Sequence, residues 1–139
     1  MASKVRDIMT GSPTSVAPEL DLVTVARTMR DEDIGTVLVI DGENLQGVVT
    51  DRDLVVRGLA AGLDPRTTTA AGICSSATVT VGPDDALDKA VELMRERAIR
   101  RLPVLENGRP VGILSIGDLA MERDPRSALA DITAAKPNL

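Results

Sequence analysis

The chain has 139 residues, of which 43% are hydrophobic and 27% are charged, with a formal net charge of −5 and no Phe, Tyr, Trp or His. An acidic chain without aromatic rings lacks the basic footprint and the stacking platforms that nucleic-acid-binding proteins use. No stretch approaches the ~20 apolar residues of a membrane span, so the composition predicts an ordinary globular protein with an aliphatic core.

The start of the chain and its single cysteine favour the cytoplasm. Residues 1–7 contain no apolar segment of the kind that signal peptides have. Cys74 has no second cysteine with which to form a disulfide within the chain, and this suits a reducing compartment. We therefore expect a cytoplasmic protein.

Hydrophobic periodicity and turn residues predict one series of elements twice. Each series has a short leading segment, a brief strand, a helix, two buried strands joined by a turn, and a second helix. The first series is expected at residues 5–9, 15–17, 22–32, 36–40 and 46–49, with a helix from Thr50 to near Gly62. The second is expected at residues 70–74, 78–81, 86–97, 102–105 and 111–114, with a helix from Ser115 that ends at Pro125. A further helical piece is expected at residues 126–134.

The two series are copies of each other. Residues 5–54 align with residues 70–119 without a gap, at a constant offset of 65 positions, and leave eleven identical pairs. These pairs include Gly47 with Gly112 and Asp53 with Asp118. A register that keeps such residues in place indicates an internal duplication.

Each copy ends in a motif made of Gly, two aliphatic residues, a hydroxyl residue, two variable positions, Asp and Leu. The motif occupies residues 47–54 and residues 112–119. A strand that runs into a helix presents unpaired N–H groups and a positive dipole end, which favour an anion. A carboxylate one turn into the helix can accept hydrogen bonds from both hydroxyls of a cis-diol. The same spacing also predicts a capping box, and a cap that opens when a ligand arrives is compatible with both interpretations.

With the segments at residues 34–41 and 99–106, these motifs resemble the CBS domain, named after cystathionine β-synthase. The resemblance covers residues 5 to about 120 and suggests a tandem pair, or Bateman module, similar to standalone bacterial CBS-pair proteins. It implies an α/β (α+β) fold of two tandem β-α-β-β-α repeats packed sheet to sheet as a pseudo-twofold module. The expected repeats span residues 5–62 and 70–124, followed by a helical extension and tail at residues 125–139.

The resemblance also implies two clefts that bind an adenosine-containing ligand such as AMP, ADP, ATP or S-adenosylmethionine. In the family pattern the motif Asp binds the ribose hydroxyls, while the motif Ser or Thr faces the phosphate. The cleft of the second motif is expected to contain Ser115, Asp118, Arg101, Arg100, Ile113, Met9, Thr14, Ile34 and Gly35. The cleft of the first motif is expected to contain Thr50, Asp53, Val48, Thr36, Cys74, Val79 and Ile99, with Arg100 again nearby.

The two clefts are predicted to differ. Arg101 matches a basic family position that reaches the phosphate, whereas the first copy has Thr36 there. We therefore expect the Asp118 cleft to prefer phosphorylated ligands. The alternative is that Arg100 and Arg101 are solvated surface charges. Cys74 is expected to be a small core residue, with a thiol switch at the cleft rim as the alternative.

Catalysis and metal binding are not expected. Without His and with one Cys, the chain cannot form a Ser/His/Asp or Cys/His catalytic site or a Cys/His zinc site. The paired acids Asp51 and Asp53 are typical of a helix first turn.

The sequence therefore predicts a non-catalytic nucleotide-binding sensor that needs no cofactor and acts on a protein partner. Its apolar helix at residues 54–63 is expected to support a homodimer. The alternative is a structural dimeric interaction module whose clefts are empty or vestigial.

Overall fold

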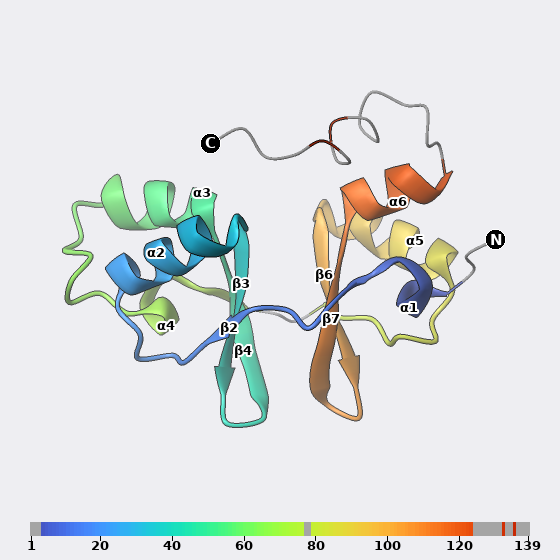
Figure 1. The fold of residues 1–139 in the computed structure, drawn as a ribbon, viewed down its shortest axis with the longest axis horizontal. Coiled ribbons are helices and arrows are strands. Elements are labelled where there is room, and N and C mark those ends of the chain that lie inside the picture. Colours follow the sequence, from blue (N-terminus) through green and yellow to red (C-terminus); the bar gives the residue numbers. More distant parts are fainter. Residues whose placement is uncertain (1–3, 77–78, 124–131, 133–134, 136–139) are drawn as a thin grey trace. The chain divides into compact units, whose positions relative to one another are not determined.

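The structure is a computed structural model that describes residues 4–76, 79–123, 132 and 135. The chain divides into two compact units (Figure 1). Unit 1 combines Met1–Pro13 with Val79–Leu139, and unit 2 is Thr14–Thr78. Helices and a β-sheet occur in both units, as an α/β fold requires.

Unit 2 is built on a four-stranded sheet with the order β2-β3-β4-β5. Its strand β2 pairs in parallel with β3, and the other pairings are antiparallel. Three helical segments accompany the sheet, and the second of them, α3, continues into the wider turns of the π-helix η1. The elements are β2 (Ser15–Val16), α2 (Leu22–Glu32), β3 (Thr36–Asp41), β4 (Asn44–Thr50), α3 (Asp51–Asp53), η1 (Leu54–Leu59), α4 (Ala70–Ile73) and β5 (Ser75–Ser76).

Unit 1 is built on a three-stranded antiparallel sheet with the order β1-β7-β6. Its elements are α1 (Val5–Ile8), β1 (Thr10–Gly11), α5 (Leu87–Arg97), β6 (Arg101–Glu106), β7 (Arg109–Ser115) and α6 (Ile116–Arg123). In both units the second long strand, β4 or β7, runs directly into a helix, which places the hydroxyl–x–x–Asp motif at the strand–helix junction.

The core of each unit is aliphatic, as the composition predicts. In unit 2, one stripe of α2 buries Leu22, Val25 and Met29, which cluster with Val37 and Val49 of the sheet. Their spacing along α2 is that of a single helical face. The equivalent stripe of α5 buries Leu87, Ala90 and Met94 against β6 and β7 in unit 1. The duplication therefore produces two similar cores.

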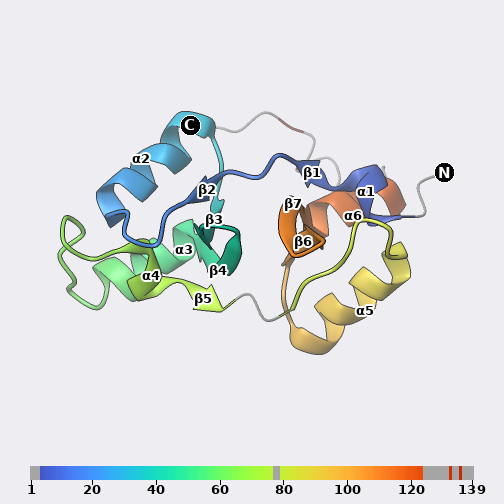
Figure 2. The ribbon, with the colours of Figure 1, turned by 90° about the horizontal axis from the view of Figure 1, so that it is seen from below.

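Two short strands, β1 and β5, were not predicted from the sequence. They follow the leading segments of the two repeats, and each joins the sheet of the other repeat (Figure 2). Ser75 of β5 pairs with Val48 of β4, and Thr10 of β1 pairs with Ile113 of β7. The compact units are thus offset from the sequence repeats by the length of one leading segment.

Glycines on the partner strands allow this pairing. A Cβ atom on Gly47 would overlap the Ser75 carbonyl oxygen and lie 3.0 Å from Cys74 Sγ. A Cβ atom on Gly112 would lie 2.6 Å from Met9 Sδ and 2.9 Å from the Thr10 carbonyl oxygen. Both distances are shorter than carbon can tolerate, so the motif glycine is required at this contact.

The second repeat departs from its predicted elements in two places. Instead of a strand at residues 78–81, Val81 forms an isolated parallel bridge with Val104, and residues 77–78 lie outside the described ranges. Helix α5 begins after Ala86, whose side chain cannot cap it, while Asp85 accepts a hydrogen bond from the Gly82 N–H at 2.7 Å. The predicted helix at residues 126–134 and the extension at 125–139 fall, apart from residues 132 and 135, outside the described chain.

Ion pairs join the N-terminal segment of unit 1 to the part of this unit that comes from the second repeat. Arg6 Nε donates to Asp84 Oδ1 at 2.9 Å, and Arg6 Nη2 lies 3.4 Å from Glu106 Oε2. The hydrogen bond from Arg6 lowers the pKa of Asp84 below its ordinary value of 3.8. Helix α1 is therefore held by its buried Val5 and by charges that respond to pH.

We predict that Gly47→Ala destabilises the protein by about 1–3 kcal/mol, because its methyl group would push β5 away from β4. Gly11→Ala is the matched control, since a Cβ atom there meets nothing within 4 Å. Urea denaturation followed by circular dichroism measures both. Equal midpoints for the two variants would contradict the proposed contact.

Acid is predicted to weaken the Arg6–Asp84 anchor. A carboxyl group with a depressed folded-state pKa stabilises the protein above its unfolded-state pKa of about 3.9, and this contribution is lost as the pH falls through the folded-state pKa. Urea midpoints at about pH 7 and about pH 3 should therefore differ less in Arg6→Ala than in the unchanged chain. An identical difference in both proteins would show that the pair does not contribute.

Candidate functional site

Each strand–helix junction is closed by a reciprocal pair of hydrogen bonds. In unit 2 the Thr50 N–H donates to Asp53 Oδ2 at 2.8 Å, and the Asp53 N–H donates to Thr50 Oγ1 at 3.1 Å. In unit 1 the Ser115 N–H donates to Asp118 Oδ2 at 2.9 Å, and the Asp118 N–H donates to Ser115 Oγ at 3.1 Å. Both motifs are capping boxes in this structure. All four side chains are only partly buried, so a ligand can reach them.

The neighbouring strand supplies the next predicted residue to each junction. Arg101 is directly opposite Ser115 in the β6–β7 ladder, and Thr36 is directly opposite Thr50 in the β3–β4 ladder. Residues directly opposite each other have side chains on the same face of a sheet. The structure therefore brings Arg101 to the Ser115–Asp118 junction and Thr36 to the Thr50–Asp53 junction.

The residue before each of these also touches the junction through its backbone. The Ile116 N–H donates to the Arg100 carbonyl oxygen at 2.9 Å, and the Asp51 N–H donates to the Gly35 carbonyl oxygen at 3.0 Å. Arg100 and Arg101 are both exposed, and neither guanidinium forms an ion pair with a described carboxylate. Two cationic groups thus flank the motif of unit 1.

The two leading segments, each of which leads into a strand in the sheet of the other repeat, place Met9 and Cys74 beside the motifs. Met9 lies against Gly112 and next to the β1 strand that pairs with Ile113, whereas Cys74 lies against Gly47 and next to the pairing partner of Val48. The Cys74 thiol is partly buried, at 3.6 Å from the Ala71 carbonyl oxygen. Nothing in these contacts favours the thiol switch over a packing role.

The other predicted residues belong to the opposite unit. Thr14, Ile34 and Gly35 lie in unit 2, although they were predicted for the Asp118 cleft; Val79 and Ile99 lie in unit 1, although they were predicted for the Asp53 cleft. Within their own units, Ile34 packs on the core of unit 2, and Val79 and Ile99 pack on that of unit 1. Their membership of either cleft stays a prediction.

Arg57 is a residue that the sequence analysis missed. Its Nη1 atom donates to the Ile73 carbonyl oxygen at 3.1 Å and to Ser75 Oγ at 3.2 Å. These two acceptors flank Cys74, so the π-helical turn that carries Arg57 fixes the segment beside the first motif. An arginine on an exposed helix face gives no sequence signal for such a contact.

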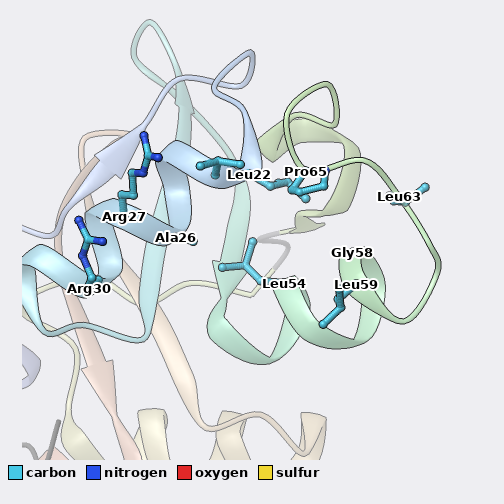
Figure 3. Close-up of a pocket in the computed structure, with 10 residues that line it drawn as sticks. Leu22, Ala26, Arg27, Arg30, Leu54, Gly58, Leu59, Leu63 and Pro65 are labelled. Carbon is cyan, nitrogen blue, oxygen red and sulfur yellow. The ribbon is translucent and has the colours of Figure 1, made fainter.

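Each unit also has an apolar groove between its two long helical elements. In unit 2 the groove lies between α2 and η1 (Figure 3), where Leu22, Leu54, Leu59 and Pro65 border it and Arg27 lies along α2. In unit 1 a groove between α5 and α6 is lined by Val91, Met94, Ile99, Ile116, Leu119 and Ala120, with Arg95 and Arg123 at its border. Both grooves measure about 390 Å³. The apolar face predicted at residues 54–63 is part of the first, where Leu59 is 75% exposed.

Two further tests of the described residues concern metals and membranes. Among them, no three His, Cys, Asp or Glu side chains cluster as a metal site would require. None of the helices within the described ranges has the length and apolarity needed to cross a bilayer.

Comparison with known proteins gives a consistent picture. The family model for the CBS domain matches residues 5–58 and 70–124. Hypoxic response protein 1 of Mycobacterium tuberculosis is 39% identical over 116 residues, which is 83% of this chain and 81% of the relative. The crystal structure of Hypoxic Response Protein I with two coordinated zinc ions has a TM-score of 0.76 at 38% identity and covers 84% of this chain and 96% of that one. The CBS domain protein PAE2072 from Pyrobaculum aerophilum, complexed with AMP, has a TM-score of 0.77 at 30% identity, with coverages of 92% and 98%.

Proposed function

The chain belongs to the family of CBS-domain proteins and has the tandem-repeat fold of that family, and from this premise we propose that it is a non-catalytic sensor of an adenosine-containing ligand. CBS-domain pairs are regulatory modules, and this coarser role comes with family membership. The finer role, binding of AMP, ADP, ATP or S-adenosylmethionine, is our proposal. We also propose that the protein is located in the cytoplasm, where such ligands are made.

The observation that carries the proposal is the meeting of Ser115, Asp118 and Arg101 at one strand–helix junction. The Asp118 carboxylate is one turn into α6 and suits a cis-diol, while the Arg101 guanidinium and the amino end of α6 suit a phosphate. A nucleotide carries both groups within one molecule. The AMP bound to PAE2072 supports this class of ligand.

Ligand binding would compete with the capping box. The Asp118 carboxylate already accepts a hydrogen bond from the Ser115 N–H. A ribose that donates its hydroxyls to the same carboxylate must therefore break this hydrogen bond or share its acceptor. Ligand binding can then shift the equilibrium between the capped and uncapped states. The size of this shift is limited by the difference in the ligand's affinity for the two states. This shift is the signal that a protein partner would receive.

The crystal structure of Hypoxic Response Protein I contains two coordinated zinc ions, but this chain lacks the donors for a Cys/His zinc site. The chain has no His and a single Cys, so at most one Cys or His ligand is available. We therefore base no part of the proposed function on a metal. The same inventory leaves Ser/His/Asp and Cys/His catalysis without the residues they need.

We also propose that the protein is a homodimer that uses the grooves of both units. The described residues expose Leu59 and Leu63 in the lining of the first groove, Val55 and Val56 on the helical element η1 that borders it, and Ile116 and Met121 on the helix that borders the second. Exposed aliphatic clusters of this kind mark interaction surfaces. A second copy of the chain would present the same exposed surfaces, and a twofold interface pairs the same surface of both copies.

Thermal melts with AMP, ADP, ATP, NADH, S-adenosylmethionine and cyclic dinucleotides test the sensor proposal. Because the chain lacks aromatic fluorescence, circular dichroism or an added dye must report the transition. We expect at least one adenosine-containing ligand to raise the melting temperature. Arg101→Ala is expected to lower the affinity for a phosphorylated ligand by about 10-fold, because a charged hydrogen bond is lost.

Arg109→Ala serves as the control, since this residue is at the far end of β7. If Arg101→Ala leaves nucleotide affinity unchanged, the predicted phosphate role of Arg101 is wrong. If no ligand shifts the melt, the alternative of a structural interaction module with empty clefts is favoured.

The dimer proposal predicts that Leu59→Glu produces monomers, because it places a charge in the apolar contact. Sedimentation velocity measures the change, and circular dichroism checks that the fold persists. Glu43→Gln, in the hairpin turn of unit 2, is the control for a charge change. A monomeric unchanged chain would contradict the proposal directly.

A further inference from the structure

One buried polar atom in unit 2 has no partner. Thr36 is 9% exposed, and its Oγ1 atom, which is buried, has no hydrogen-bond partner among the described residues. A buried hydroxyl without a partner costs free energy, so its retention needs an explanation. A valine has nearly the same shape and would not incur this cost.

The position of Thr36 indicates where its partner would be. Alternation along β3 sends Val37 and Val39 into the core of unit 2, so Thr36 lies on the opposite face of the sheet. It is directly opposite Thr50, the hydroxyl residue of the first motif. The unpartnered hydroxyl therefore faces the same side as the Thr50–Asp53 junction.

The charges around the two junctions have opposite signs. We compare five equivalent positions: Gly35, Thr36, Asp51, Arg52 and Asp53 in unit 2, and Arg100, Arg101, Ile116, Gly117 and Asp118 in unit 1. Two aspartates and one arginine give the first set a net charge of −1, whereas two arginines and one aspartate give the second set +1. Because the backbone hydrogen bonds of the two junctions correspond, these charges act on the same geometry.

Gly35 makes the difference sharper. A Cβ atom at this position would lie 2.9 Å from Asp51 Oδ2, so the glycine leaves room for the Asp51 carboxylate. The equivalent residues of unit 1 are Arg100 and Ile116, and neither carries a carboxylate. The exposed Asp51 carboxylate thus stands next to the Gly35 backbone at the mouth of the first junction. A phosphate brought there would meet two carboxylates and no arginine on the neighbouring strand.

We propose that the two junctions take different ligands, and that the junction of unit 2 selects an uncharged adenosine-type nucleoside to which Thr36 Oγ1 forms a hydrogen bond. This inference rests on the proposed function, since it concerns the same pair of sites. The ribose of the nucleoside is held by Asp53, and its lack of phosphate suits the net negative charge. The chain then binds a nucleoside at the junction of unit 2 and a phosphorylated nucleotide at the junction of unit 1.

The test uses the full chain with Arg101→Ala and Asp118→Asn combined, which disables the junction of unit 1 while keeping an acceptor for the Ser115 N–H. Isothermal titration calorimetry with adenosine and with ATP is then carried out on this variant. We expect adenosine to bind and ATP to bind at least about 10-fold more weakly, because like charges oppose it. Equal binding of the two ligands, or binding of ATP alone, overturns the inference.

Substitution of Thr36 separates recognition from packing. In the same background, Thr36→Val should leave the melting temperature of the unliganded protein unchanged or raise it. The same substitution should lower the affinity for adenosine by about 3- to 10-fold, because one hydrogen bond is lost. Thr36→Ser, which keeps the hydroxyl, should retain the affinity. If Thr36→Val lowers the melting temperature and leaves the adenosine affinity unchanged, the hydroxyl has only a structural role and the inference is wrong.

Titration of the unchanged chain separates ligand binding as such from ligand selection by unit 2. If neither adenosine nor any adenosine-containing ligand of the thermal-melt panel binds to it, the proposed function itself fails. If ATP binds in an Arg101-dependent manner while the double variant binds no adenosine, only the inference about unit 2 is overturned.

Discussion

The close contact between a motif glycine and an exchanged strand is the constraint on which the rest of this structure depends. Gly47 leaves space for the Ser75 carbonyl oxygen and the Cys74 thiol, and Gly112 leaves space for Met9 and the Thr10 carbonyl oxygen. Without these contacts β5 and β1 could not complete the sheets. The strands β4 and β7, which contain these glycines, then lead to the hydroxyl and the carboxylate at the start of the helix that follows. One small residue thus couples the architecture of each unit to the chemistry of its junction.

Much of the fold follows from local patterns in the sequence. The stripe of Leu87, Ala90 and Met94 predicts α5 to within one residue of its observed start, and the duplication transfers this prediction to α2. The capping boxes of Thr50 and Ser115 are also visible in the residue spacing alone. What escaped prediction is non-local, because β1 and β5 have two residues each and exist only through their partners on the other repeat.

The candidate sites were predictable to a similar depth. The motif residues and Arg101 could be named because they recur at a fixed offset and match a family pattern. The contact of Arg57 with Ile73 and Ser75 depends on the register of a π-helical turn, which the sequence does not encode in any simple period. The unpartnered hydroxyl of Thr36 is likewise invisible in the sequence, since its burial depends on neighbours from distant positions. Such residues make the two copies of a duplicated site chemically different.

The offset between repeats and units has a consequence for how the protein is made on the ribosome. Unit 2 is one continuous stretch and can fold as soon as Thr78 has left the exit tunnel. Unit 1 needs residues from both ends of the chain, so α1 and β1 must wait until β7 has been synthesised about a hundred residues later. During this interval the nascent chain carries an unattached amino-terminal segment with its apolar Val5 and Ile8 exposed. Translation of the second repeat therefore does more than add a second site, because it provides the surface on which the first residues of the chain finally fold.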